Sequence, residues 1–272
     1  MPKLSDQKFL LNDQYKNTKN LEARNYFRDH FNVNKYGFYR FVFDHFPQIP
    51  NLKILELGCG TGSLWTKNIN RIPASWEIIL SDLSEAMVNK IRKNLNKVRN
   101  KIKFQIIDAQ SIPFNNETFD MVIANHMLYH VPDRIKALTE IKRVLKPQGY
   151  FYASTTGRNH MRELNELLNS FYVGLRLWDK ESSEQFILEN GTKQLQPFFS
   201  NIKLYKYDDY LLVTESEPLI QYVLTTQAKV YLVKRLPDFR KFIKIKLSKG
   251  PIRITKDIGL FIAKDLSTSG VD

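Results

Sequence analysis

A short apolar run followed by three alternating glycines constrains this sequence more than any other feature. Residues 54–57 are typical of a short buried strand. Gly58, Gly60 and Gly62 follow directly, and residues without a Cβ permit a tight turn. A more helix-like run begins at residue 63. A strand, a glycine turn and a helix in this order bring backbone N–H groups close to a nucleotide-like ligand.

The spacing of these glycines separates two ligand classes. A dinucleotide fingerprint would place its third glycine at position 63, which is occupied by Ser63. Here the third glycine comes one place earlier, and the acidic residue Glu56 lies two places before the first. The pattern therefore departs from the dinucleotide fingerprint, and its meaning depends on the strands that follow.

The composition limits the compartment and the class of protein. The 272 residues suffice for one domain with insertions, and 43% of them are hydrophobic. Cys59 is the one cysteine, so no disulfide can form within the chain, which predicts a reducing, cytoplasmic location. No apolar run approaches the roughly 18 residues that cross a bilayer, and no signal-peptide core is apparent. The formal charge of +13 fits either a polyanionic partner or a lysine-rich solvated surface.

Residues 1–50 predict a helical cap in front of the glycine strand. Residues 21–31 are compatible with a helix, and apolar residues in 38–46 repeat at the spacing of an amphipathic helix. Tyr15 and Arg24 either reach a ligand or belong to the surface of a packing helix.

Residues 51–157 alternate between strand-like and helix-like stretches, which predicts a parallel sheet. Each apolar run of strand length is followed by a polar residue and then by a stripe at helical spacing. Further strands are expected over 76–80, 103–107, 119–124 and 150–154, with helices over 84–98 and 132–145.

Acidic residues end the second and third of these strands. In open α/β sheets, ligands bind in the crevice at the carboxyl ends of the strands. Asp82 could accept hydrogen bonds from both hydroxyls of a ribose, or it could cap the next helix together with Ser84. Asp108 could accept from an exocyclic amine while the Ala109 N–H donates to a ring nitrogen, which would recognise adenine. The alternative for Asp108 is an exposed loop position.

Four motifs in order resemble the class I S-adenosylmethionine (SAM) dependent methyltransferases. Glu56-Leu57-Gly58-Cys59-Gly60-Thr61-Gly62 is similar to their first motif, Asp82 to the ribose-binding acid, and Asp108-Ala109 to the adenine-binding pair. Residues 125–133 and 137–147 are similar to the "LHHVPD…AL.EI.RVLKPGG" block of the methyltransferase type 11 family. That family includes the ubiquinone and menaquinone biosynthesis methyltransferases.

The resemblance implies an α/β fold with a Rossmann-like, seven-stranded methyltransferase sheet. This sheet would be mostly parallel with an antiparallel last strand, flanked by helices, and would bind SAM and release S-adenosylhomocysteine. Gln148 stands where the family usually has glycine, a change expected to affect the turn but not the cofactor site. The expected cofactor-binding residues are Tyr15, Arg24, Glu56, Gly58, Cys59, Gly60, Gly62, Asp82, Leu83, Met87, Asp108, Ala109, Asn125 and His126.

Methyl transfer requires the acceptor to be held in line with the sulfonium methyl group. Positioning at about 3–3.5 Å can supply roughly 7–11 kcal/mol, and some acceptors also need a base. His126, Tyr129 and His130, after the fourth strand, are the nearest candidates. Alternatively, His126 packs against the methionine part of the cofactor and His130 caps the following helix. No metal ligands are expected.

Residues 158–249 interrupt the sheet pattern and predict a lid over the acceptor. Residues 250–266 should complete the core with a last strand over 258–263, and 267–272 form a tail. Within the insertion, helices are expected over 160–171, 218–224 and 231–246, a helix–turn–helix-like piece over 183–199, and a strand over 202–207.

The motifs predict a SAM-dependent methyltransferase with a small-molecule acceptor. A lysine and arginine cluster from Lys229 to Lys256 could steer an anionic molecule, an acyl carrier or RNA. No Pro-Pro-aromatic motif of base-amine methyltransferases follows the fourth strand, which disfavours nucleic acid. The alternatives are an RNA methyltransferase and a SAM-binding scaffold without catalytic activity.

Overall fold

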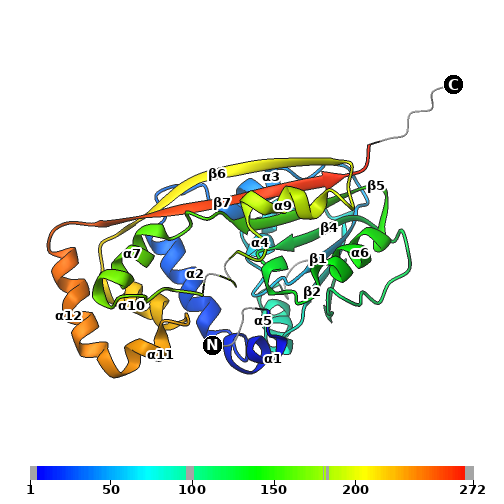
Figure 1. Ribbon diagram of the computed structural model, residues 1–272. Helices are drawn as coiled ribbons and strands as arrows, with labels where there is room; N and C mark the ends of the chain where they lie inside the picture. Colours follow the sequence, from blue (N-terminus) through cyan, green and yellow to red (C-terminus); the bar gives the residue numbers. More distant parts are fainter. Residues whose placement is uncertain (1–4, 96–100, 180, 182–183, 267–272) are drawn as a thin grey trace.

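A twisted sheet with helices on both faces forms the centre of the protein (Figure 1). The computed structural model describes residues 5–95, 101–179, 181 and 184–266. The sheet has seven strands in the order β3-β2-β1-β4-β5-β7-β6, and β7 is antiparallel to both of its neighbours. This arrangement confirms the predicted fold class. The strands are β1 (Lys53–Leu57), β2 (Glu77–Asp82), β3 (Lys101–Ile106), β4 (Phe119–Asn125), β5 (Leu145–Thr156), β6 (Asn201–Val213) and β7 (Ile252–Lys264).

The central strands are almost continuously apolar because helices cover both of their faces. Leu55 and Val122 enter one hydrophobic cluster, whereas Ile54 and Ile123 enter another on the opposite face. The first cluster packs against α6 (Arg134–Val144), and the second against α3 (Phe38–Asp44), α4 (Ser63–Thr66) and α5 (Glu85–Asn94).

The strand order reverses at β1, and this reversal creates the crevice that a ligand can enter. β1 pairs with β2 on one side and with β4 on the other, all three in parallel. The register pairs Leu57 with Ser81, so the strands that carry the glycine loop and Asp82 end at the same edge. The crossovers diverge from this point, and open α/β sheets bind ligands there.

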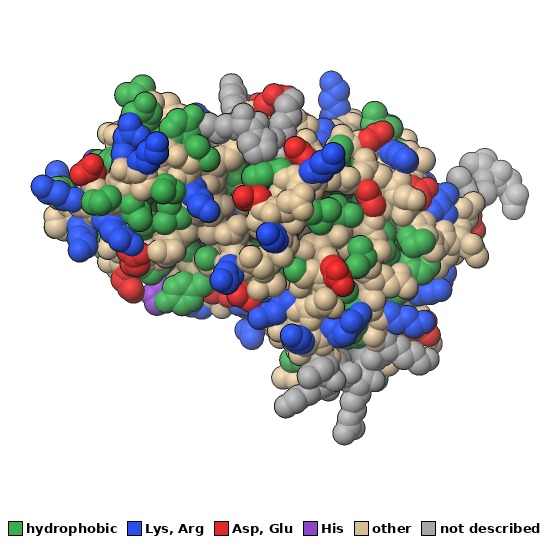
Figure 2. All heavy atoms as spheres, turned by 90° about the horizontal axis from the view of Figure 1, so that it is seen from below, with side chains coloured by type: hydrophobic (Ala, Val, Ile, Leu, Met, Phe, Trp, Pro, Cys, Tyr) green, Lys and Arg blue, Asp and Glu red, His purple; other side chains and the backbone are tan. Residues whose placement is uncertain are grey.

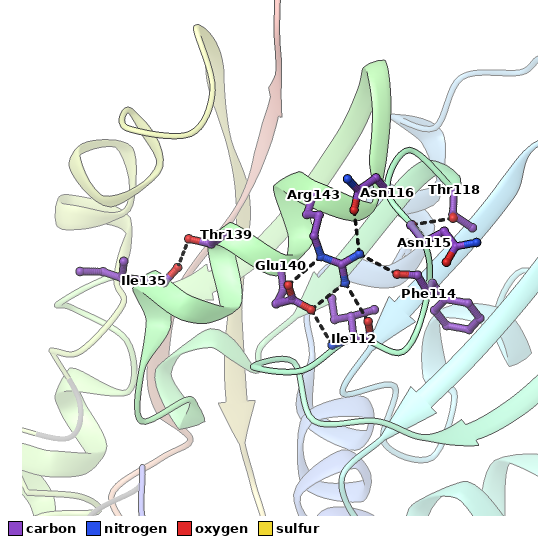
Figure 3. Close-up of polar contacts among 9 residues, drawn as sticks. All are labelled: Ile112, Phe114, Asn115, Asn116, Thr118, Ile135, Thr139, Glu140 and Arg143. Carbon is purple, nitrogen blue, oxygen red and sulfur yellow. Dashed lines mark hydrogen bonds and ion pairs between the residues drawn. The ribbon is translucent and has the colours of Figure 1, made fainter.

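Part of the sequence block that resembles the type 11 family forms α6, and two of its residues have a structural role. Arg143 donates to both carboxylate oxygens of Glu140, at 2.7 and 2.8 Å, and to the carbonyls of Phe114 and Ile112 (Figure 3). The Ile112 N–H in turn donates to Glu140 Oε2 at 2.9 Å. These bonds fasten α6 to the loop that begins at Asp108, and so help to fix the edge of the crevice.

A third hydrophobic cluster lies beside the sheet, where α2 (Lys19–Phe31) packs against α7 (Arg162–Phe171), α10 (Ser216–Leu224) and α12 (Leu236–Leu247). Phe27, Leu164, Leu219, Phe239 and Ile254 are all buried in this cluster. Figure 1 shows α2 running between the sheet and these helices. The elements are α1 (Gln7–Phe9), η1 (Leu10–Gln14), α2 (Lys19–Phe31), α7 (Arg162–Phe171), α9 (Leu188–Leu195), α10 (Ser216–Leu224), α11 (Lys229–Leu232), η4 (Val233–Arg235) and α12 (Leu236–Leu247), with η2 (Ile69–Arg71) and η3 (Leu128–His130) in the sheet domain.

The predicted 158–249 insertion differs from the observed structure in two places. β6 belongs to the core sheet, and β6 and β7 are each longer than the strands predicted over 202–207 and 258–263. Asp209 and Lys256 interrupt the apolar pattern, but they face each other across the two strands and form a buried ion pair. The piece predicted over 183–199 contains the single helix α9 among its described residues. The predicted tail, 267–272, lies outside the described residues, and no described helix is long and apolar enough to cross a bilayer.

Gln148 occupies a strained position in the irregular part of β5, where the pairing with β4 shifts register, so replacing it with glycine is expected to stabilise the protein. Its φ is +64°, in the left-handed region that disfavours residues with a Cβ. Gln148→Gly should raise the free energy of unfolding by about 0.5–1 kcal/mol in urea denaturation. The same change in the middle of α10, Gln221→Gly, is the control and should lower it by about 1 kcal/mol. A loss of stability in both variants would contradict this explanation.

Candidate active site

A cavity of about 340 Å³ lies at the carboxyl ends of β1, β2 and β4. Residues of the N-terminal segment, α2, β7 and α10 also line it. The residues predicted to bind the cofactor or act as bases line this cavity, with the exception of Gly62. The structure thus brings together Tyr15, Arg24, Glu56, Gly58, Cys59, Gly60, Asp82, Leu83, Met87, Asp108, Ala109, Asn125, His126, Tyr129 and His130.

The glycines after β1 have two separate functions. Gly58 and Gly60 have φ values of +66° and +55° and line the cavity. A Cβ on Gly58 would lie 2.7 Å from Met127 Cβ, so this position accepts no side chain. Gly62 lies behind the cavity wall, where a Cβ would come within 2.4 Å of Ile91. Gly62 allows α4 to pack closely on α5, and its predicted role in binding the cofactor stays a prediction.

Asp82 fastens the glycine loop to the start of α5. Its carboxylate accepts from the Gly60 N–H and the Ser84 N–H, each at 2.9 Å. Burial raises the pKa of Asp82, and the backbone bonds from Ser84, Gly60 and Leu83 partly oppose this rise. Ser84 is at the N-cap position, but its hydroxyl donates to the Tyr15 carbonyl at 2.8 Å instead of capping the helix.

Glu56 is a buried carboxyl group with two side-chain donors. Trp65 Nε1 donates to one oxygen at 2.5 Å, and Asn125 Nδ2 donates to the other at 3.2 Å. Burial raises the pKa of Glu56 to about 7, although both hydrogen bonds act in the opposite direction. Burial also raises the pKa of the Cys59 thiol, which excludes a thiolate nucleophile in the loop at neutral pH.

Asp108 follows the edge strand β3 and accepts hydrogen bonds from neighbouring residues, so it is not an isolated loop residue. Gln7 Nε2 donates to it at 2.9 Å, and the Gln110 N–H does so at 2.9 Å. Burial raises the pKa of Asp108, but the bonds from Gln110 and Gln7 outweigh it, so the pKa is lowered overall. The carboxylate is therefore charged at the cavity wall, next to Ala109.

The N-terminal segment crosses the cavity and is held at several points. The Tyr15 hydroxyl lies 3.0 Å from His130 Nε2, while the Tyr15 carbonyl accepts from Ser84 as described. Arg24 Nη2 donates to Gln14 Oε1 and to the Thr225 carbonyl, both at 2.5 Å. Tyr15 and Arg24 therefore line the cavity, and their contact with a ligand stays a prediction.

The three predicted bases differ in their suitability. Burial, with the charges of Arg28 and Lys256, lowers the pKa of His126 to about 3, so its imidazole is neutral and a weak base. Burial raises the pKa of the Tyr129 phenol, so Tyr129 is protonated at neutral pH. His130 contacts Tyr15 across the cavity, and the following helix is capped by Asp133, whose side chain accepts from the Lys136 N–H. The alternative that His130 caps this helix is therefore wrong.

The cavity is also lined by basic residues that the sequence did not identify as site residues. Arg28, His160 and Lys256 line it together with His126. Arg28 lies one helical turn after Arg24, at the i,i+4 spacing that puts both on one face of α2. This spacing could have identified Arg28 as a site residue from the sequence. His160 and Lys256 come from distant parts of the chain, and no local pattern marks them.

The comparisons with known proteins concern mainly the sheet domain. Residues 55–153 match a family described as "Methyltransferase domain". The ubiquinone/menaquinone biosynthesis C-methyltransferase of Rickettsia prowazekii is 38% identical over 124 residues, 42% of this chain and 50% of that protein. The corresponding protein of Idiomarina loihiensis is 34% identical over 100 residues, 36% and 40% of the two chains. The chain thus spans about half or less of the length of these relatives.

Solved structures share the fold at lower identity. Phosphoethanolamine N-methyltransferase 2 of Haemonchus contortus, in complex with SAM, superposes with a TM-score of 0.59 at 17% identity, covering 97% of this chain and 60% of that one. YcgJ of Bacillus subtilis gives 0.56 at 19% identity, covering 80% and 94%. The family match, the relatives and the sheet order agree: residues 55–153 form a class I SAM-dependent methyltransferase domain of the type 11 family.

Proposed function

We propose that this chain transfers the methyl group of SAM to a small-molecule acceptor bound at the basic end of the cavity. The observation that carries the proposal is one cavity lined by two chemically different groups of residues. Glu56, Asp82 and Asp108, which we call the acidic end, lie in or directly after β1, β2 and β3. Arg28, His160 and Lys256, which we call the basic end, are close enough for the charges of Arg28 and Lys256 to act on His160. The acidic end suits the hydroxyl and amine donors of SAM, and the basic end suits an acidic molecule. The single, buried thiol supports a cytoplasmic site for this reaction.

The residues at the acidic end fit the cofactor. Gly58 and Gly60 have no side chains, so a ligand can approach the backbone closely at these two positions. Each oxygen of Asp82 accepts one bond of 2.9 Å from the backbone, and a carboxylate has about four acceptor positions. Asp82 can therefore accept ribose hydroxyls while it holds the loop. Asp108 and the Ala109 N–H are the corresponding pair for adenine.

In this mechanism the chain positions the acceptor and receives one proton from it. When bound, SAM supplies an electrophilic methyl group, and the chain holds the acceptor in line with it. The N-terminal segment covers the site and excludes water, which strengthens the polar contacts beneath it. His130 Nε2, 3.0 Å from the Tyr15 hydroxyl, is the group we propose to receive the acceptor's proton.

Arg28 supports an acidic acceptor. Its guanidinium donates to Asn25 Oδ1 at 2.6 Å and to the Arg24 carbonyl at 3.2 Å, both uncharged groups. Among the described residues, no carboxylate forms an ion pair with Arg28, whereas the neighbouring Lys256 is paired with Asp209. The positive charge of Arg28 adds to burial in lowering the pKa values of His126 and His160. A half-buried, unpaired cation favours a carboxylate or phenolate on the acceptor.

The named activity of the relatives is compatible with this acceptor class. The proteins of Rickettsia prowazekii and Idiomarina loihiensis are named as C-methyltransferases of ubiquinone and menaquinone biosynthesis. An aromatic ring with an ionisable hydroxyl group is one member of the class that Arg28 would favour.

Calorimetry with SAM and an Asp82 variant tests the cofactor site. Asp82→Asn should weaken SAM binding by about 1.5–3 kcal/mol, roughly ten- to a hundredfold, because charge-assisted hydrogen bonds to the ribose are lost. Glu85→Gln, an exposed acid three residues later, is the matched control and should bind normally. Unchanged affinity in Asp82→Asn would refute the ribose assignment.

A pair of simple aromatic probes tests the acceptor end separately. With S-adenosylhomocysteine bound, benzoate should bind at least tenfold more tightly than its neutral analogue benzamide, and Arg28→Gln should abolish this preference. Arg240→Gln removes one exposed charge on α12 and should leave the preference unchanged. Equal binding of both probes to the unmodified protein would show that the acceptor end does not select anions, whatever the result at Asp82.

A further inference from the structure

An exposed apolar surface lies where the end of α7 meets α11 and η4. We call it the docking face and define it by Tyr172, Val173, Val230, Tyr231 and Val233, whose exposed fractions are 45, 87, 72, 40 and 57%. The rings of Tyr172 and Tyr231 stack with centroids 6.3 Å apart, which brings the two segments together. Contiguous exposed apolar groups of this kind mark an interaction surface more often than scattered ones do.

The docking face is surrounded by positive charge. Residues 229–249 contain eight lysines and arginines and one aspartate. Of these eight cations, only Arg240 forms an ion pair with another described residue, Glu217. Arg235 lies within the face itself, with its guanidinium 5.2 Å from the centre of the Tyr172 ring. Figure 2 shows basic and hydrophobic side chains interspersed at the end of the molecule formed by α10, α11 and α12 in Figure 1.

We propose that the docking face rests on the surface of an anionic lipid bilayer. Valine and tyrosine side chains can enter the boundary between headgroups and acyl chains, while surrounding lysines and arginines contact anionic headgroups. Tyrosine suits this depth because its ring is apolar and its hydroxyl is polar. The unpaired cations around the apolar centre favour an anionic bilayer over a second copy of this chain, because the positive charges of two copies would repel each other.

The docking face is connected to the cavity by the same two segments. Trp178, six residues after Tyr172, lines the cavity and lies 5.1 Å from the Arg24 guanidinium. Gln227, three residues before Val230, donates its N–H to the Leu177 carbonyl at 3.1 Å. A bilayer at the docking face would therefore contact the loops that wall the cavity. The surface itself is independent of which acceptor is methylated.

Sedimentation with large unilamellar vesicles tests the proposal on the full chain. Vesicles of phosphatidylcholine with about one third phosphatidylglycerol should bind the protein at least tenfold more strongly than pure phosphatidylcholine. The triple variant Val173→Ser, Val230→Ser, Val233→Ser should reduce this partition coefficient about tenfold or more. The double variant Ile106→Ser, Ile135→Ser is the matched control, because both isoleucines are exposed, at 55 and 74%, but lie outside the docking face.

Three results would overturn the proposal. The first is an absence of binding to the anionic vesicles, and the second is equal binding by the triple variant with its circular dichroism unchanged. The third is a concentration-dependent dimer in light scattering that the triple variant abolishes, since a second copy would then occupy the face. Weakened vesicle binding as salt rises from 50 to 500 mM would support the electrostatic part, because salt screens lysines and headgroups.

Discussion

His130→Ala should reduce turnover about a hundredfold or more while leaving affinity for S-adenosylhomocysteine within about threefold of the unmodified protein. General-base catalysis typically contributes about 10²–10⁴-fold. Of the three candidate side chains, His130 is the one placed to act, because burial lowers the pKa of His126 to about 3 and keeps Tyr129 protonated. Turnover is measured as release of S-adenosylhomocysteine with an accepted acceptor.

His30→Ala is the matched control for this experiment. His30 is exposed and lies 2.9 Å from Glu215, so its loss should change turnover little. Tyr15→Phe removes only the hydroxyl that contacts His130 and should lower turnover about tenfold, with faster hydrogen exchange in residues 7–18. If His130→Ala retains more than half of the turnover, the base is elsewhere or the acceptor needs none.

Glu56 should make the protein less stable as the pH rises from about 4.5 to about 7. The folded pKa of about 7 is above the usual value of 4.5, so the folded state binds more protons than the unfolded state in this window. Stability then falls with rising pH, because the unfolded state is the one that loses its proton first. The full effect is about 3 kcal/mol, at about 1.4 kcal/mol per pH unit.

Urea denaturation of Glu56→Gln at pH 5 and pH 8 measures this effect. The unmodified protein should lose about 2.5 kcal/mol more of its unfolding free energy between these pH values than the variant does, because part of the full effect is already lost at pH 5. Glu85→Gln, an exposed acid in the first turn of α5, should behave like the unmodified protein. Asp82 also has a pKa raised by burial, and it is present in all three proteins. If the unfolding free energy of Glu56→Gln changes with pH as that of the unmodified protein does, the Glu56 carboxyl group has an ordinary pKa.

Local sequence patterns predicted the sheet and the acidic end of the cavity correctly. Alternating apolar runs identified the strands, and the polar residues after them, Asp82 and Asp108, had to lie at one edge because parallel strands end on the same side. Gly58 and Gly60 were recognisable because a turn with positive φ needs residues without a Cβ. Gly62 had the same local signal, but its distance to Ile91 on α5 gives it a packing role.

The basic end of the cavity was decided by the tertiary structure. Arg28, His160 and Lys256 are separated by more than 90 residues from one to the next, and the buried pairing of Lys256 with Asp209 depends on the register of β6 and β7. The protonation of Glu56 and His126 likewise depends on burial, which the order of residues does not specify. By itself the sequence determined the strands, the glycine turn and the acids that follow them, since these depend on short-range geometry. The tertiary structure alone determines which ionisable groups line the cavity and which of them are protonated. Desolvation and pairing depend on neighbours that are distant in sequence.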